Sequence, residues 1–124
     1  VYSGSYICVN RGAVLEVGGG GYINHGASVD CFQSISIGKN TIISKNVTLR
    51  DSDNHSINGN TQISAPIVIG DNVWIGMNVT VLKGVTIGDG AVIGANSVVT
   101  RDIPAGCVAA GNPCRVLKEG IVWN

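Results

Sequence analysis

One histidine in a polar segment is the strongest candidate for chemistry in this sequence of 124 residues. His55 ends the run Asp51-Ser52-Asp53-Asn54-His55. An imidazole is the side chain best suited to remove a proton near neutral pH, and a nearby carboxylate or backbone carbonyl would fix its tautomer. The local residues alone favour an ordinary surface histidine. The position of His55 in the wider sequence pattern favours a general base, because loops on rigid scaffolds often carry function.

The spacing Asp51-x-Asp53-x-His55 also offers two carboxylates and an imidazole to a divalent cation. The pattern does not continue as a calcium-binding loop, because the glycine that such a loop needs after its first ligands is missing from Ser56-Ile57. We therefore expect a solvated acidic loop and no metal. The cysteines lack the paired spacing of a zinc ribbon, so reduced thiols in a cytoplasmic protein are expected, with two disulfides as the alternative. They are Cys8, Cys31, Cys107 and Cys114.

Two other positions have side chains suited to contact a ligand. Asn24, which precedes His25, would position a hydroxyl group, although asparagine also serves in turns with left-handed backbone. A turn role is the simpler interpretation of His25. Trp74 precedes Ile75 and should face outward if Ile75 faces the core. An outward tryptophan can cover a ligand or a neighbouring subunit.

Charge excludes some classes of partner. The formal net charge is zero, which gives no electrostatic footprint for nucleic acid or an anionic membrane. No apolar run approaches the length of a membrane span, and we expect no signal peptide in these residues. Arg101, Arg115 and Lys118 are close in sequence near the end of the chain, where guanidinium groups would suit phosphate recognition. A solvated basic tail is the alternative.

The fold that must position these residues is indicated by an aliphatic residue that recurs every six positions. A helix repeats every 3.6 residues and a strand every two, so this period indicates a hexapeptide β-solenoid. Three hexads would complete one triangular coil, with the aliphatic residue and the residue four positions later facing inward. The aliphatic positions are Ile37, Ile43, Leu49, Ile69, Ile75, Val81, Ile87, Ile93 and Val99. The second inward positions are Thr41, Val47, Val73, Val79, Val85, Ala91 and Ser97.

The pattern divides the chain into three parts. Residues 1–22 show little periodicity and are expected to form an incomplete coil. Residues 23–106 are the β-helix domain, with a protruding loop near residues 50–66, although Ile57 and Ile63 keep the phase of the repeat. Residues 107–124 form a tail. Because the chain opens at Val1 inside repeat-like sequence, we expect further residues to precede it.

Several runs resemble the hexapeptide-repeat acyltransferases. These are Ile69–Gly76, Gly84–Thr100, Ile103–Gly106 and Gly111–Val116. The similarity is greatest to the galactoside and maltose acetyltransferases and the polysaccharide O-acetyltransferases. It implies an all-β, left-handed parallel β-helix that forms a homotrimer. It also implies acetyl-CoA bound in grooves between subunits, and a cytoplasmic enzyme of polysaccharide biosynthesis.

The resemblance assigns roles to individual residues. The general-base histidine of the family falls on His55, and its active-site asparagine falls on Asn24. Trp74 would line the reaction chamber and touch both the cofactor and the acceptor. The remaining expected cofactor contacts are Gly76, Met77 and Ala95 near the thioester and pantetheine arm, and Thr100, Arg101 and Arg115 near the nucleotide.

The acceptor contacts follow the family pattern less well. Phe32 occupies the position of an acidic residue that contacts the acceptor in sugar acetyltransferases, which leaves Asp30 and Asp53 as candidates. We expect O-acetylation of a sugar hydroxyl. N-acetylation of an amino sugar or an amino acid is the alternative, and a silent β-helix scaffold is the alternative from another class. A γ-class carbonic anhydrase-like site would need three histidines, and the chain has two.

Overall fold

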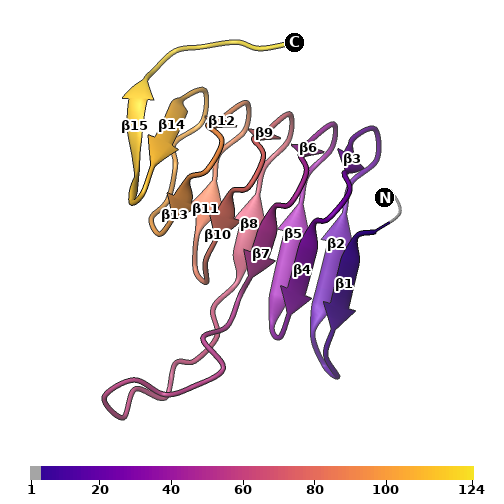
Figure 1. Cartoon of the computed structure of the whole chain (residues 1–124), viewed down its shortest axis with the longest axis vertical. Helices are drawn as coiled ribbons and strands as arrows, with labels where there is room; N and C mark the ends of the chain where they lie inside the picture. Colours follow the sequence, from indigo (N-terminus) through magenta and orange to yellow (C-terminus); the bar gives the residue numbers. More distant parts are fainter. Residues whose placement is uncertain (1–3) are drawn as a thin grey trace.

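Short strands wind into a triangular column of five coils in the computed structural model, which describes residues 4–124 (Figure 1). No α-helix occurs in that range. Each of the first four coils contributes one strand to each of three faces, and the fifth reaches the second face only through a parallel bridge between Ile87 and Ile103. Successive coils pair in parallel. This pairing satisfies the backbone groups of one coil with those of its neighbours. The predicted all-β parallel β-helix is therefore confirmed.

Each face of the column is a sheet. Sheet A contains, in spatial order, β1 (Tyr6–Val9), β4 (Ser28–Cys31), β7 (Thr48–Arg50), β10 (Thr80–Val81) and β13 (Val98–Val99). Sheet B contains β2 (Val14–Val17), β5 (Ser34–Ile37), β8 (Ile67–Ile69) and β11 (Thr86–Ile87). Sheet C contains β3 (Tyr22–Ile23), β6 (Ile42–Ile43), β9 (Trp74–Ile75), β12 (Val92–Ile93), β14 (Val108–Gly111) and β15 (Cys114–Lys118). Among the strands of residues 4–124, β15 alone pairs antiparallel, with β14.

The core consists of the residues that the period of six predicts. All nine recurring aliphatic residues, and all seven residues four positions after them, are buried. The two polar members of the set are hydrogen-bonded. Thr41 Oγ1 donates to the Gly70 carbonyl, and Ser97 Oγ donates to the Gly94 carbonyl. The interior thus holds no side-chain polar atom without a partner among the described residues.

Asparagine forms many of the corners between faces. Asn40, Asn46, Asn72, Asn78 and Asn96 all have φ between 55° and 63°. A short polar side chain tolerates this left-handed backbone better than most residues do. The corners of the repeat therefore follow from residue type, as its core does.

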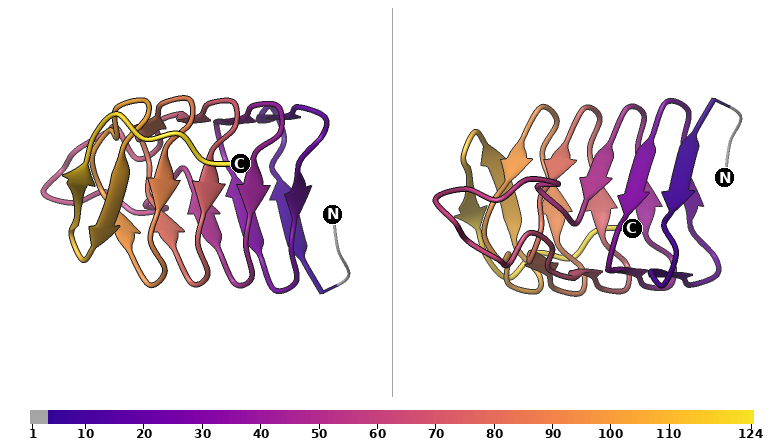
Figure 2. Two further views of the ribbon diagram at one scale, coloured as in Figure 1. Left: turned by 90° about the horizontal axis from the view of Figure 1, so that it is seen from above. Right: turned by 90° about the horizontal axis from the view of Figure 1, so that it is seen from below.

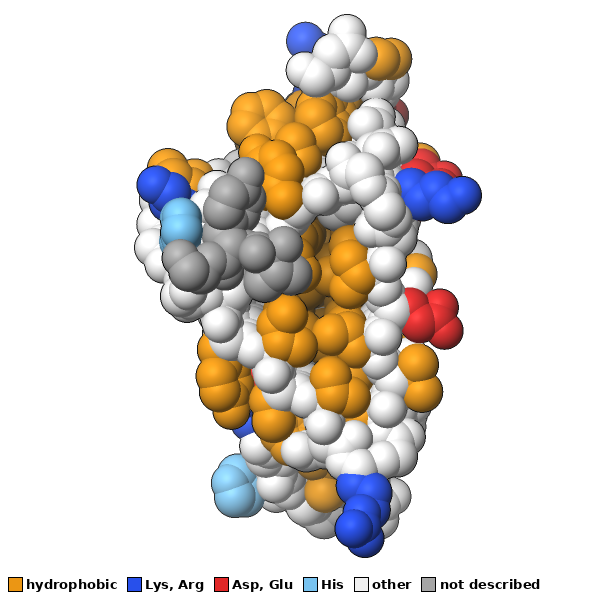
Figure 3. Space-filling model, turned by 90° about the vertical axis from the view of Figure 1, so that its right-hand side faces the viewer, with side chains coloured by type: hydrophobic (Ala, Val, Ile, Leu, Met, Phe, Trp, Pro, Cys, Tyr) orange, Lys and Arg blue, Asp and Glu red, His pale blue; other side chains and the backbone are white. Residues whose placement is uncertain are grey.

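The first described coil differs from the later ones in length. Ile7 pairs with Val29, 22 residues later, whereas Ile75 pairs with Ile93, 18 residues later. Residues 6–27 thus form a coil, although the sequence before Ile23 lacks a clean period of six. Figure 3 views this end of the column and shows apolar side chains gathered on it. Exposed apolar residues of the first coil are Tyr6, Ile7, Val9, Val14, Val17 and Tyr22.

Two segments leave the column. Residues 51–66 project as a long loop between sheets A and B, and the segment after β15 runs back along the coils (Figures 1 and 2). Ile57 keeps the phase of the repeat but is 64% exposed, so this part of the loop does not follow the coil. Residues 4–124 include no helix long and apolar enough to span a membrane.

Candidate active site

The loop that carries His55 is fixed at its base by a buried carboxylate. Asp51 is fully buried and accepts three backbone hydrogen bonds, from the amides of Phe32, Gln33 and Ser34, at 2.7–2.8 Å. The chain leaves the coil at Asp51 and so supplies no backbone carbonyls to the corner of the preceding coil. The Asp51 carboxylate accepts the hydrogen bonds of the amides at that corner instead. The expectation that Asp51 belongs to a solvated acidic loop was wrong.

Lys83 holds the two limbs of the loop together. Its Nζ lies 2.8 Å from Asp53 Oδ2 and donates to the Gln62 carbonyl at 2.9 Å. Lys83 follows β10 on the adjacent coil. Its ion pair with Asp53 therefore attaches the loop to the column at a point two residues before His55. His55 itself is exposed. Asp53 thus lies two residues before the predicted base in the sequence, and its carboxylate forms an ion pair with the Lys83 ammonium group.

A second group of predicted residues meets on sheet C. Trp74, Gly76, Met77 and Ala95 line one groove of about 410 Å³. Trp74 is 44% exposed, as expected for a side chain next to the inward-facing Ile75. Gly76 is needed where two coils approach, because a Cβ there would lie 2.8 Å from the Ile93 carbonyl oxygen and 2.9 Å from the Ala95 nitrogen. Val92, Ile93, Gly94 and Ser44 complete the walls.

Asn24 and Asp30 occupy different faces. Asn24 lies at the corner after β3, where its Oδ1 accepts the His25 amide at 2.7 Å. Asp30 lies in β4 and pairs with Arg50 at 3.4 Å. Arg50 also donates to the Ser52 carbonyl at the start of the loop. Asp30 is thus linked to the base of the loop and Asn24 to the end of a sheet C strand.

Thr100, Arg101 and Arg115 are all exposed near the last coil. Thr100 and Arg101 follow β13, and Arg115 belongs to β15. The described contacts include one for Arg115, whose Nη1 donates to the Cys114 carbonyl at 3.2 Å. None of the described contacts joins these three residues to the sheet C groove, so their predicted role at a nucleotide stays a prediction.

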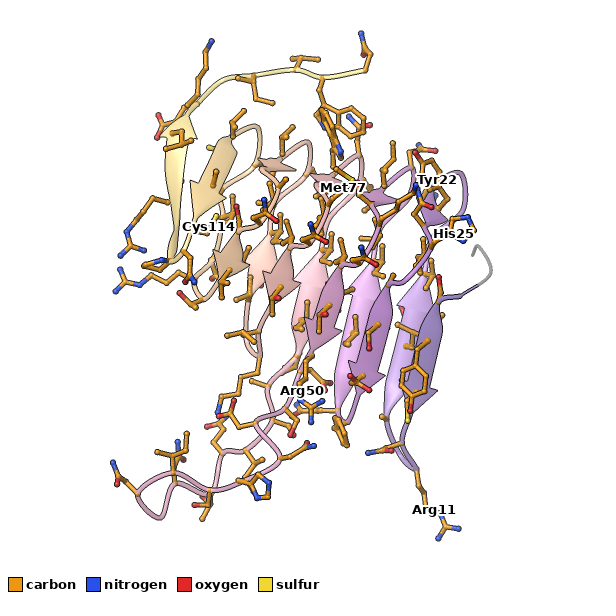
Figure 4. The ribbon with its side chains drawn as sticks, in the orientation of Figure 1. Arg11, Tyr22, His25, Arg50, Met77 and Cys114 are labelled. Atoms are coloured by element: carbon orange, nitrogen blue, oxygen red, sulfur yellow. The ribbon has the colours of Figure 1, made fainter. Side chains whose placement is uncertain are left out.

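A single chain does not bring its histidine to its groove. In Figure 4, Met77 lies on the side of the column that sheet C forms. Arg50 lies on another side, at the base of the loop. Both views in Figure 2 agree that the loop projects from the side away from sheet C. The candidate residues therefore form two half-sites: a loop half-site with His55 and Asp53, and a groove half-site with Trp74, Gly76, Met77 and Ala95.

Known proteins share this architecture. Residues 66–101 match the family described as bacterial transferase hexapeptide (six repeats). The chain is 45% identical over 112 residues to galactoside O-acetyltransferase of Escherichia coli strain K12, covering 87% of this chain and 55% of that protein. A structure of a hexapeptide-repeat acetyltransferase from Vibrio cholerae O1 biovar eltor, complexed with acetyl coenzyme A, matches with a TM-score of 0.80 at 32% identity. It covers 93% of this chain and 69% of that one.

The chain belongs to the hexapeptide-repeat acetyltransferase family. The structure of a polysialic acid O-acetyltransferase also matches, with a TM-score of 0.89 and 31% identity, over 98% of this chain and 61% of that chain. The resemblance predicted from the repeat motifs is thereby confirmed. This member spans only about half the length of the Escherichia coli protein.

Titratable groups of this hexapeptide-repeat acetyltransferase show the effect of its dry core. Burial, followed by the negative charge of Asp51, raises the pKa of the Cys31 thiol above its ordinary value. Burial also raises the pKa of Cys114. All four cysteines are free thiols. Residues 4–124 contain no group of three or more His, Cys, Asp or Glu side chains placed to hold a metal ion.

Three residues near the half-sites escaped sequence reasoning. Lys83 had no signal beyond its place at a coil corner. Ser44 lines the groove, and its only signal was that it follows the inward-facing Ile43. Trp123 packs against Trp74 in a tilted arrangement, with ring centroids 5.8 Å apart, and no local sequence pattern predicts this contact.

Proposed function

We propose that this protein transfers an acetyl group from acetyl-CoA to a sugar hydroxyl. The observation that carries the proposal is the groove on sheet C, where four residues predicted to contact the cofactor meet around one cavity. Relatives described as acting on galactosides and polysialic acid support a sugar acceptor, and the acetyl coenzyme A complex of a family member supports the donor. A role in polysaccharide biosynthesis in the cytoplasm is part of this proposal.

The two half-sites combine between copies of the chain. The loop of one copy reaches the sheet C groove of its neighbour, and a closed ring of three equivalent copies provides three such sites. His55 then lies near the thioester held along Trp74, Gly76 and Met77. This arrangement explains why the loop projects away from the groove of its own chain.

The proposed chemistry is direct transfer. His55 removes the proton of the acceptor hydroxyl while the hydroxyl oxygen attacks the thioester carbonyl carbon. A carbon–oxygen bond forms, the carbon–sulfur bond breaks, and the imidazolium returns its proton to the departing thiolate. Among the described residues, neither the Met77 nor the Ala95 amide donates to a backbone carbonyl, so either is available to an oxyanion in the groove. General-base assistance of this kind is typically worth ~10²–10⁴-fold.

Replacing the histidine tests the mechanism. His55→Ala should lower kcat by about 10²–10⁴-fold while acetyl-CoA binding, measured by calorimetry, stays the same. Thr61→Ala changes an exposed side chain of the same loop and is the matched control. Turnover of His55→Ala within a few-fold of the parent would reject the base. Absence of acetyl-CoA binding by the parent would instead favour a scaffold.

Subunit mixing tests the shared site. His55→Ala and Trp74→Ala are each expected to be nearly inactive. When they are unfolded and reassembled together, some interfaces combine an intact histidine with an intact tryptophan, so activity should return. Separately reassembled parents are the control. No recovery, despite mixed assemblies seen by native mass spectrometry, would place the site within one chain.

A further inference from the structure

The C-terminal segment brings a second tryptophan to the edge of the sheet C groove. After β15 the chain runs back across the coils (Figure 2). The Ile121 amide donates to the Gly106 carbonyl at 2.9 Å, and Trp123 Nε1 donates to the Asn72 carbonyl at 2.8 Å. These two bonds hold the Trp123 ring against Trp74, with the ring planes inclined at 49°. The tail is therefore attached at a defined place.

This contact creates a pocket that continues the groove. Trp123 and Asn124 enclose a cavity of about 370 Å³ together with Tyr22, Ile42, Ser44 and Trp74. Ser44 and Trp74 also line the groove assigned above to the thioester. A molecule in the pocket would therefore adjoin a molecule held in the groove, with Ser44 and Trp74 between them.

The composition of the pocket suits one class of acceptor. Three aromatic rings supply flat apolar surface with a negative face, and Ser44 and Asn124 add a hydroxyl and an amide at its margin. A sugar ring presents weakly positive C–H groups on its faces and hydroxyls on its edge, which matches this arrangement. No Lys, Arg, Asp or Glu among the described residues lines the pocket, so it offers no charged partner to an amino acid.

We propose that Trp123 is a specificity-determining residue that forms the outer wall of an acceptor pocket and stacks on a sugar ring. The proposal rests on the proposed function for the identity of the neighbouring groove. It adds that the tail of the chain, which carries no repeat motif, selects the acceptor. A cap that only stabilises Trp74 is the competing explanation.

Steady-state kinetics distinguish these roles. Transfer from acetyl-CoA to methyl β-galactoside, maltose and a sialic acid oligomer is measured for Trp123→Ala, Trp123→Leu and Trp123→Phe. We expect the KM for the best sugar to rise about three- to tenfold in the Ala and Leu variants, with recovery in Phe, because only an aromatic face is lost and restored. The KM for acetyl-CoA should stay unchanged. Val122→Ala, on the exposed neighbouring residue, is the control.

Two results would overturn the assignment. One is an acceptor KM that is unaffected in Trp123→Leu. The other is a parallel rise in the KM for acetyl-CoA, which a purely structural cap would produce. Trp123→Leu keeps an apolar contact with Trp74, so it guards against a failure of the Ala variant to fold.

Binding measurements separate this proposal from the proposed function. Saturation-transfer NMR of the same three sugars is recorded with His55→Ala protein, which cannot turn them over. Sugar binding that is lost in Trp123→Leu supports the pocket, even if calorimetry finds no acetyl-CoA binding and the proposed function fails. Acetyl-CoA binding without binding of any of the three sugars overturns the pocket and leaves the transferase proposal standing.

Discussion

The two half-sites are built in opposite ways. The groove half-site lies on sheet C, where every strand pairs with neighbours and inward side chains pack in a continuous core. The loop half-site projects from the column. It depends on the Asp51 carboxylate, the Lys83 ammonium group and a short antiparallel bridge between Ser52 and Ser64.

This difference in contacts indicates that the groove half-site is rigid and that the loop half-site can change position. A groove shared by several coils is held by many small contacts, so no single surface residue determines its shape. A loop held by a few polar contacts can change position when one of them is lost, since regions with few buried apolar contacts open most easily. The proposed base therefore sits on the more easily altered half.

Two isoleucines in the same phase of the repeat give the largest expected contrast. Ile75 is fully buried in the column, whereas Ile57 is 64% exposed in the loop. Ile75→Ala should lower the free energy of unfolding by about 2–5 kcal/mol, because it removes core contacts and leaves a cavity. Ile57→Ala should change it by less than about 0.5 kcal/mol. Urea unfolding of both variants measures the contrast, and equal losses would mean that the loop packs as a coil does.

The joint between the two regions should give a smaller effect. Asp51→Asn keeps the shape of the side chain but replaces one acceptor oxygen by a donor that faces backbone amides. We expect a loss of about 1–3 kcal/mol in the free energy of unfolding, the cost of buried donors left without partners.

Asp53→Asn is the matched control for Asp51, because its carboxylate is exposed and its ion pair with Lys83 contributes little to global stability. Hydrogen exchange at Phe32, Gln33 and Ser34 should quicken in Asp51→Asn and stay unchanged in Asp53→Asn. Unchanged exchange in both variants would show that other groups satisfy this corner.

The period of six predicted most of the column because each hexad must meet the same requirement within its own six residues. Each hexad needs one aliphatic residue and one small residue facing inward, and these positions proved buried from Ile37 to Val99. The same logic placed Trp74 outward and opened a loop near His55. It gave little for residues 6–22, because the coil that they begin takes 22 residues rather than 18 and its side chains lie at an exposed end.

The parts that escaped prediction depend on contacts between distant residues. Asp51 looked like part of an acidic loop, yet its partners are amides of the preceding coil. Ile23, Val29 and Ile35 recur every six residues, whereas Ile37 starts a new phase two residues after Ile35. This slip was a signal that the corner is irregular. Trp123 reaches Trp74 across 49 positions of sequence and has no periodic neighbours. The side chain that would orient His55 was not predicted, and the described contacts do not supply one.

A smaller loss of stability than that of Asp51→Asn is expected at Lys83, which bridges both limbs of the loop. Lys83→Met removes a partly exposed ion pair and a hydrogen bond but keeps the apolar stem, so the free energy of unfolding should fall by at most about 1 kcal/mol. The effect on the loop itself should be larger than the effect on the whole protein. Hydrogen exchange and proteolytic cleavage within residues 54–62 should both quicken.

Kinetics then connect this local change to the position of the base. If Lys83 fixes the loop, Lys83→Met should lower kcat with no change in the KM for acetyl-CoA, because the groove half-site is intact. Lys83→Arg should restore part of the rate by keeping the charge. Lys39→Met removes an exposed lysine at another coil corner and controls for loss of charge. A loop that opens in Lys83→Met without any fall in kcat would show that the rigidity of the loop does not limit the proposed reaction.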